Sequence, residues 1–407
     1  MPRRVRGYYG WRIVGALAIT ETVSFGILYY AFTVFVTPMR ETLGWSTASV
    51  TGAYSLSLLI SGLCAPLVGG LVDRHGARLL MSGGSLLAGA LLMAWSFVET
   101  PSAFYLVFAG MGVASAAVLY EPAFAVIALW FERRRSAALT LLTFVGGFAS
   151  VIFIPVAAAL VESLGWRDAL RVLALVQVLV TFPLHALVLR HRPSDVGQGV
   201  DGAPEGTARH VAARPSATPR EAFASADFRR LTIAFAASMA VILALGVHLV
   251  PILLRRGLDP LEAAGAAAAL GVMALPGRLI FTPLGARYPR GMVTASIFVL
   301  QAFGLASLLL VPGAWGVGAF VVLFGAGFGA ITPARAALVA ESFGSVHYGA
   351  IAGRLMIYGT AARAAAPVAV GAAVTLTGSD AVAIGVLAAL AFAAAWAVSG
   401  VGSRTHP

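Results

Sequence analysis

Charged residues are scarce in this chain, lysine is absent and cysteine occurs once. Of the 407 residues, 59% are apolar and 11% are charged, whereas a soluble domain carries about 25% charged residues. This composition excludes an ordinary soluble fold. Cys64, in an apolar stretch, has no partner for an internal disulfide. A phosphate-binding loop needs its lysine, and no His-Glu-x-x-His zinc motif occurs. We therefore expect no ATP-driven activity of this chain alone, no metal and no cofactor.

Long apolar runs are abundant instead. Crossing a hydrocarbon core about 30 Å thick takes about 20 helical residues, and twelve runs qualify. Backbone groups in lipid must be hydrogen-bonded within their own segment, which favours helices over strands. All seven tryptophans lie near a predicted end, as in an aromatic belt. The predicted spans are roughly 11–38, 46–71, 79–98, 103–130, 136–161, 168–189, 231–253, 262–286, 291–311, 315–339, 348–374 and 380–400.

The distribution of arginine predicts the orientation in the membrane. With the N-terminus placed inside, 20 of the 28 arginines fall on the cytoplasmic side, five fall outside and three lie within predicted helices. Because cytoplasmic loops carry an excess of positive residues, we predict a multi-pass protein of a cell (inner) membrane with both termini in the cytoplasm. The net charge of +11 then needs no nucleic-acid partner.

A proline- and arginine-rich stretch divides the twelve spans into six and six. We predict an N-terminal half at 1–189, a flexible cytoplasmic linker at 190–229 and a C-terminal half at 230–407. Short pairs repeat between the halves, such as Gly110-Met-Gly112 with Gly325-Ala-Gly327, 215 residues later. The expected fold is an all-α membrane protein of two pseudo-symmetric six-helix halves, with a solute site at the midplane.

The connection between the second and third spans carries a recognisable pattern. It reads Gly70-Leu-Val-Asp73-Arg74-His-Gly76-Ala-Arg78 and resembles the G-x-x-D-R-x-G-x-R signature of the major facilitator superfamily. Its glycines permit a tight turn, and Asp73 can neutralise one of the arginines. The resemblance implies the twelve-helix transporter fold and a gating role for this loop.

A narrower resemblance covers most of the chain. The segments Tyr9-Gly10-Trp11-Arg12, Trp130-Phe131-Glu132-Arg133, Gly165-Trp166-Arg167 and Gly277-Arg278 are similar to those of monocarboxylate transporters and bacterial oxalate:formate antiporters. The resemblance implies transport of a small organic carboxylate with a proton or a counter-anion. One departure affects the coupling: Ala274 stands where the monocarboxylate pattern has an aspartate.

Five charged residues inside the predicted spans are candidates for a functional role. A charge at the bilayer centre costs roughly 2.5–3.5 kcal/mol, so such residues mark functional sites by default. Arg278 and Arg363 suit a carboxylate substrate, because a guanidinium donates two parallel hydrogen bonds. Arg335 lies nearer an end, where it can snorkel or pair with Glu341. Since arginine stays protonated, Glu21 and Glu121 are the candidate proton carriers; the alternative is that each neutralises a buried arginine.

Aromatic and apolar residues complete the predicted site. Tyr120 can add a hydroxyl, and Pro122 removes a helical hydrogen bond and loosens the fourth span there. The expected wall around the carbon end of the substrate comprises Leu28, Tyr29, Phe144 and Tyr358, although ordinary helix packing explains each of them equally well. His248 can titrate near neutral pH, but we interpret it as a packed structural residue.

The sequence leaves three functions open. The first is a proton-coupled monocarboxylate transporter, and the second is a carboxylate exchanger, favoured by two arginines and by the missing aspartate. The third is a drug or sugar transporter of the same fold, for which arginines inside the membrane are less suited. The expected partners are a small carboxylate, a proton or counter-anion, and membrane lipid.

Overall fold

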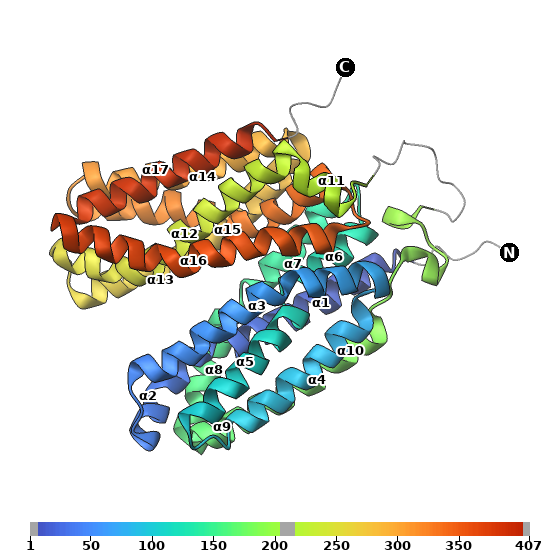
Figure 1. The fold of residues 1–407 in the computed structure, drawn as a ribbon, viewed down its shortest axis with the longest axis horizontal. Coiled ribbons are helices and arrows are strands. Elements are labelled where there is room, and N and C mark those ends of the chain that lie inside the picture. The colour runs from blue at the N-terminus through green and yellow to red at the C-terminus, as the bar shows by residue number, and fades with distance from the viewer. Residues whose placement is uncertain (1–6, 204–215, 402–407) are drawn as a thin grey trace. The chain divides into compact units, whose positions relative to one another are not determined.

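The computed structural model of the chain describes residues 7–203 and 216–401, and these residues form a bundle of long helices (Figure 1). Six spans come before the linker. They are α1–η1–α2 (Gly10–Phe25, Gly26–Tyr30 and Phe32–Leu43), α3 (Thr47–His75), α4 (Ala77–Trp95), α5–α6 (Pro101–Val118 and Tyr120–Trp130), α7–α8 (Arg135–Gly146 and Ala149–Leu164) and α9–η2–α10 (Trp166–Val176, Gln177–Thr181 and Phe182–Val188).

Six more spans follow three short helices, η3 (Pro193–Val196), η4 (Val200–Gly202) and α11 (Pro219–Ala224). These spans are α12 (Ala226–Arg255), α13 (Pro260–Arg287), α14 (Arg290–Leu310), α15 (Gly313–Phe343), α16 (Tyr348–Thr377) and α17 (Asp380–Ser399). The described residues thus hold twelve helices long and apolar enough to cross a membrane. The prediction of an all-α protein with twelve spans is confirmed. Residues 204–215 of the predicted linker lie outside the described residues.

Short polar residues and glycines set the ends of the spans. The Ser225 hydroxyl accepts a hydrogen bond from the Phe228 N–H at the start of α12. Asp259 and Glu262 form a reciprocal capping box at the start of α13, which satisfies amides that have no helical partner. Gly76 ends α3 with φ of +78°, a conformation that glycine adopts without strain.

Four of the first six spans are interrupted near their middles, whereas α3 and α4 are continuous. The first and sixth spans contain the π-helical turns η1 and η2, and the fourth span breaks at Leu119, whose backbone is extended. This break lies three residues before Pro122, so the predicted loosening of the fourth span is confirmed. The last six spans are each a single α-helix despite internal prolines such as Pro276 and Pro367.

The chain forms two compact units. The first unit comprises the described residues of Met1–Ser216 and Gly344–Arg354, and the second those of Ala217–Phe343 and Leu355–Pro407. Each has its own apolar core. In the first unit α1 begins where α10 ends, because the Tyr9 hydroxyl donates to the Val188 carbonyl over 2.9 Å. We call this end of the first unit the linker end.

The tryptophans at the span ends differ in exposure. Trp315 and Trp396 are more than 80% exposed, as expected for residues that face lipid headgroups. Trp95, Trp130 and Trp166 also lie at the ends of their helices, but they are at most 5% exposed and therefore pack against protein. Trp130, for example, donates its indole N–H to the Arg190 carbonyl. A large ring fills the space where helices end, and burial requires a partner for its N–H.

Candidate functional site

Two carboxyl groups lie close together inside the first unit. Glu21 of α1 has no exposed surface, and neither of its carboxyl oxygens has a hydrogen-bond partner among the described residues. Glu121 opens α6, just after the break at Leu119, and its charge acts directly on Glu21. The alternative that Glu21 neutralises a buried arginine is therefore wrong for the described part of the chain. An acid buried in this way is suited to exchanging a proton.

Aromatic rings cluster on the spans that carry these carboxyls. The rings of Phe25 and Tyr120 are 4.6 Å apart, and those of Phe25 and Tyr29 are 6.0 Å apart. Gly146 of α7 makes room for Tyr120, since a Cβ there would overlap the Tyr120 hydroxyl. Of the other predicted wall residues in this unit, Phe144 is half-buried beside Phe148. Leu28 is 7% exposed and belongs to the apolar core of the first unit.

Arg278 lies in the second unit, where α13 packs against α15. Its Nε donates to the Gly329 carbonyl over 3.2 Å. The two backbones nearly touch, because a Cβ on Gly277 would overlap the Ala326 carbonyl and one on Gly329 would overlap the Ala274 carbonyl. Ala274, which replaces the expected aspartate, is 3% exposed in this contact. The close contact with α15 therefore fixes the orientation of the Arg278 side chain on α13.

Arg363 occupies a different environment on α16. Its side chain is half-buried and makes no hydrogen bond or ion pair with the part of the chain that the structure describes. One turn later, Pro367 removes the N–H that would bond the Arg363 carbonyl. Tyr358, five residues before Arg363, is 40% exposed. The structure thus leaves all the N–H donors of Arg363 available for an anion.

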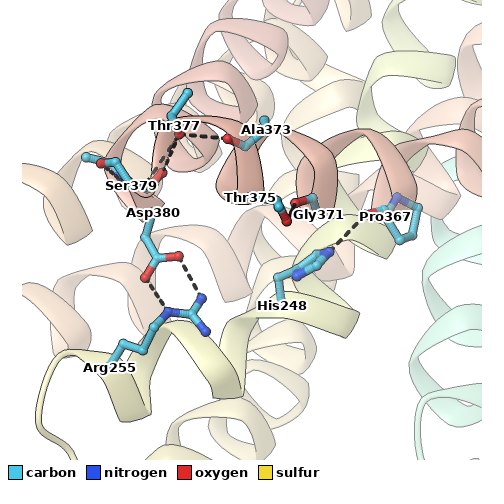
Figure 2. Close-up of polar contacts among 10 residues, drawn as sticks. His248, Arg255, Pro367, Gly371, Ala373, Thr375, Thr377, Ser379 and Asp380 are labelled. Atoms are coloured by element: carbon cyan, nitrogen blue, oxygen red, sulfur yellow. Dashed lines mark hydrogen bonds and ion pairs between the residues drawn. The ribbon is translucent and has the colours of Figure 1, made fainter.

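His248 joins two spans of the second unit. Figure 2 shows its ring reaching from α12 to the Pro367 carbonyl of α16, at 2.9 Å from Nε2. A carbonyl only accepts, so Nε2 is the donor. Closer to the end of α12, Arg255 and Asp380 form a bidentate ion pair with distances of 2.7 and 2.6 Å (Figure 2). This geometry agrees with a structural role for His248.

The loop that resembles the superfamily signature binds the start of α16. Both oxygens of Asp73 accept hydrogen bonds at 2.8 Å, one from the Gly349 N–H and one from the Ala350 N–H. Both contacts are with the α16 backbone and not with the neighbouring arginines that the sequence suggested: Asp73 caps a helix N-terminus, where a negative charge is favourable. Arg78 donates to the Ala186 carbonyl, and Arg74 is exposed.

Other features of the second unit lie apart from the arginines of the predicted site. A cavity of about 820 Å³ lies along α13 and α15, but neither Arg278 nor Arg363 lines it. Arg335 is 3% exposed and is not a surface residue. Glu341, its suggested partner, forms an ion pair with Arg290. We therefore leave Arg335 outside the candidate site.

The sequence reasoning missed a set of buried polar residues in the first unit. Gln177, Thr181 and His185 of the sixth span have no exposed surface. Their signal is present in the sequence, because they are polar residues at four-residue intervals within an apolar run. What the sequence does not reveal is the side of the helix that faces the other spans.

Comparisons with known proteins agree on the type of protein. The family model described as Major Facilitator Superfamily matches residues 17–367. Monocarboxylate transporter 13 of Rattus norvegicus is 27% identical over 343 residues, which cover 83% of this chain and 76% of that protein. The uncharacterized MFS-type transporter YcxA of Bacillus subtilis (strain 168) is 24% identical over 333 residues, which cover 79% of this chain and 78% of that protein.

Among solved structures, the chain resembles the transporter FucP in its outward conformation. The TM-score is 0.75 at 12% identity, and the match covers 95% of this chain and 97% of that one. At this identity the likeness concerns the fold alone. The length of the family match, together with the shared fold, is the basis for assigning the chain to a family.

Proposed function

Because the chain belongs to the Major Facilitator Superfamily, we propose that it is a proton-coupled secondary transporter of a small organic monocarboxylate that works by alternating access. Family and fold make it a multi-pass membrane transporter and not an enzyme. The substrate class, the coupling, the inner membrane and the cytoplasmic termini are the parts that we propose. Two six-helix halves, 1–189 and 230–407, joined by the linker 190–229, would supply the moving parts.

The observation that carries the carboxylate assignment is Arg363. A guanidinium within a membrane span is expensive unless it is paired, and Arg363 has no partner among the described residues. A carboxylate would match its planar fork with two parallel hydrogen bonds. Arg278, held at its Nε by the Gly329 carbonyl, would act as the second basic contact. Tyr358 on the same helix as Arg363 would face the substrate with it.

The first unit would supply the proton carrier. Glu21 is fully buried, Glu121 acts on it electrostatically, and the half-buried rings of Phe25, Tyr29 and Tyr120 cluster on the same spans. In this proposal one of the two carboxyls binds a proton when a substrate is bound and releases it on the opposite side. Phe144, Tyr29 and Tyr120 would also contact the carbon end of the substrate, with Leu28 supporting them from the core.

The loop Gly70, Asp73, Arg74, Gly76 and Arg78 would act in gating. Asp73 holds the first turn of α16 through two amides, and Arg363 lies further along the same helix. Breaking these two hydrogen bonds would free the start of α16 to move. Arg363 and the amides that Asp73 binds lie on the same helix, α16. A substrate bound at Arg363 would therefore affect the loop through α16.

A carboxylate exchanger is the second candidate. The buried Ala274 in place of an aspartate favours it, because α13 then carries no acid beside Arg278. An exchanger would need a carboxylate on the opposite side for every uptake event. A symporter would instead make a weakly buffered medium more alkaline when lactate is added outside.

Transport by the purified protein in liposomes tests the proposal. With radiolabelled lactate outside, we expect uptake that an acidic exterior stimulates. Arg363→Ala and Arg278→Ala should each abolish it, and Arg363→Lys should lower it by about tenfold, because lysine is a point charge without the planar fork. Oxalate and formate are tested in the same way for the exchanger.

The matched control is Arg287→Ala, which removes an exposed arginine at the end of α13. This variant should transport lactate like the unmodified protein. Every variant is first checked for membrane insertion and a single peak in size-exclusion chromatography. Unchanged uptake by Arg363→Ala would remove the basis of the carboxylate assignment.

A further inference from the structure

In the first unit the sixth span packs against both α1 and α4; Figure 1 labels α1, α4 and α10 there. Polar side chains form a line along this contact. Their shared property is burial: none is more than 7% exposed. Polar residues in a membrane span are expensive and are rarely used for packing alone. We call the following residues the polar column: Ser24 of α1, Gln177 and Thr181 of η2, His185 of α10, and Ser82 and Ser85 of α4.

Direct hydrogen bonds link most of the polar column. The Gln177 amide nitrogen donates to the Ser24 hydroxyl over 3.0 Å and lies 3.3 Å from the Thr181 hydroxyl. At the other end, the Ser85 hydroxyl lies 2.8 Å from Nδ1 of His185. Thr181 and His185 are one helical turn apart, with about 5–6 Å between Cβ atoms. In the proposal, one water molecule bonded to both would span that gap.

Glu21 lies beside this line, on the linker-end side of Ser24, because α1 begins at the linker end. It lies three residues before Ser24 on α1, so the two side chains point to the same side of the helix, again roughly one turn apart. A second water molecule would join the Glu21 carboxyl to the Ser24 hydroxyl. The polar column therefore links Glu21 in the interior with His185, three residues before the end of α10 at the linker end.

Unpartnered atoms along this line indicate that it holds water. Among the described residues, five buried polar atoms here lack any hydrogen bond: both carboxyl oxygens of Glu21, Oε1 of Gln177, Nε2 of His185 and the hydroxyl of Ser82. Buried polar groups are nearly always paired with protein or with ordered water. Buried water typically makes two to four hydrogen bonds to such groups. The polar column offers these partners at both ends and at its middle.

The backbone of the sixth span aligns the column. Gln177–Thr181 is the π-helical turn η2, two residues before Pro183, which has no N–H to donate. In a π turn the hydrogen bonds run from residue i to residue i+5, so residues four apart come close to alignment along the axis. Such turns are frequent at functional sites. The turn therefore sets Gln177 above Thr181 on the side that faces α1.

We propose that the polar column, together with buried water, conducts protons between the linker end of the first unit and Glu21. The inference rests on the proposed function, in which Glu21 is a proton carrier. His185 accepts a proton at one ring nitrogen and releases one from the other. Each hydroxyl or water then accepts a proton on a lone pair and passes on its own, until a carboxyl oxygen of Glu21 binds one. The Gln177 amide nitrogen only donates, so Gln177 relays no proton but holds the Ser24 and Thr181 hydroxyls in place. A water molecule bonded to the unpartnered Gln177 Oε1 carries the proton from Thr181 to Ser24. Only O–H and N–H bonds form and break, and the net result is one proton moved.

Charged groups around His185 are few. From α4, Arg78 donates to the Ala186 carbonyl beside it, and Arg190 bonds the carbonyls of Leu187 and Leu189 at the end of α10. From α1, the ionisable group that faces the column is Glu21. Two arginines near the linker end and an acid deeper inside favour delivery of a proton to Glu21 rather than its storage at His185.

Infrared spectroscopy tests the column without any substrate. In a lipid film of the purified protein, the carboxyl band that disappears in Glu21→Gln identifies protonated Glu21. After a change to D₂O, we expect this band to shift rapidly in the unmodified protein. In Thr181→Val and Gln177→Leu the shift should be slower by at least about tenfold, because the line of hydrogen bonds is interrupted, which corresponds to about 1.4 kcal/mol in the barrier.

Two matched variants separate conduction from packing. Thr181→Ser keeps the hydroxyl and should exchange like the unmodified protein, whereas Thr181→Val keeps the shape and should not. Gln301→Leu makes the same change at a buried glutamine of the second unit and should leave the Glu21 band unaffected. Circular dichroism and size-exclusion chromatography establish that each variant is folded.

Three results would overturn the proposal: no carboxyl band that Glu21→Gln removes, exchange as fast in Thr181→Val as in the unmodified protein, or equally slow exchange in Thr181→Ser. Lactate transport then separates the two proposals. Uptake driven by a pH gradient should fall in Thr181→Val, while lactate exchange at equal pH, which moves no net proton, should persist. If the unmodified protein moves no lactate, the substrate assignment fails, but the infrared result still decides the column.

Discussion

At the scale of single residues, one side chain at the linker end of the first unit, Asp201, orders a whole loop. Asp201 of η4 accepts hydrogen bonds from the backbone N–H groups of Glu132, Arg133 and Arg134, with distances of 3.1, 2.7 and 3.3 Å. Its φ is +57°, which aspartate tolerates better than most residues. Burial, and then the charge of Asp201, raise the pKa of the Tyr8 hydroxyl nearby.

Replacing Asp201 should therefore loosen the loop that precedes α7. In Asp201→Gly the positive φ is kept and the three acceptor contacts are lost. We expect the amides of residues 132–134 to exchange with D₂O roughly tenfold faster, which equals about 1.4 kcal/mol. Hydrogen exchange followed by mass spectrometry measures this. Asp201→Asn, which keeps one acceptor oxygen, should give a smaller effect, and equal exchange in all three proteins would show that the cap contributes nothing.

At the scale of one residue the sequence identified Asp73 but not its contact. The pattern around it indicated a loop with a carboxylate among arginines. Its actual acceptor role toward Gly349 and Ala350 involves residues more than 270 positions away. No local pattern contains this information, because which helix start lies beside the loop depends on the packing of α3 and α16.

At the scale of helices, α13 and α15 pack through glycine. Glycines recur along both helices, at Gly265, Gly271 and Gly277 of α13 and at several positions of α15. The structure separates these residues: Gly277 meets the α15 backbone, whereas nothing lies within 4 Å of a Cβ built on Gly265 or Gly271. Small residues let spanning helices approach closely, but only those on the facing side are needed for it.

This difference gives a matched pair of substitutions on one helix. Gly277→Ala should lower stability by roughly 1–3 kcal/mol, because the added methyl group overlaps the Ala326 carbonyl. Gly271→Ala should be neutral or stabilising by up to about 1 kcal/mol, because alanine is the better helix former. The thermal unfolding midpoint in detergent, followed by circular dichroism, measures both. Equal midpoints for the two variants would contradict the close approach of α13 and α15.

At the scale of the whole molecule, the number of spans constrains the termini. Twelve spans place both termini on the same side of the membrane, and the excess of arginine favours the cytoplasm. A fluorescent protein that matures only in the cytoplasm, fused after Pro407, should therefore fluoresce. The same fusion after Val311, at the end of the ninth span, should stay dark. Fluorescence from the shorter fusion alone would reverse the proposed orientation.

The twelve spans could be read from the sequence because their cause is local. A backbone in lipid must satisfy its own hydrogen bonds, and about 20 apolar residues in a row achieve this without help from the rest of the chain. The break at Leu119 was predictable for the same reason, since Pro122 removes a donor within its own helix. The family resemblance also depended on short contiguous segments such as Gly70–Arg78.

The surroundings of the buried polar groups were decided only by tertiary structure. In the sequence Ser24 is an isolated serine, and Gln177 is one polar residue in an apolar run more than 150 positions later. Their meeting depends on which face each helix turns inward and on the π turn that rotates part of the sixth span. Hydropathy records how apolar a segment is, but the direction of each side chain is set by packing between helices that are distant in sequence.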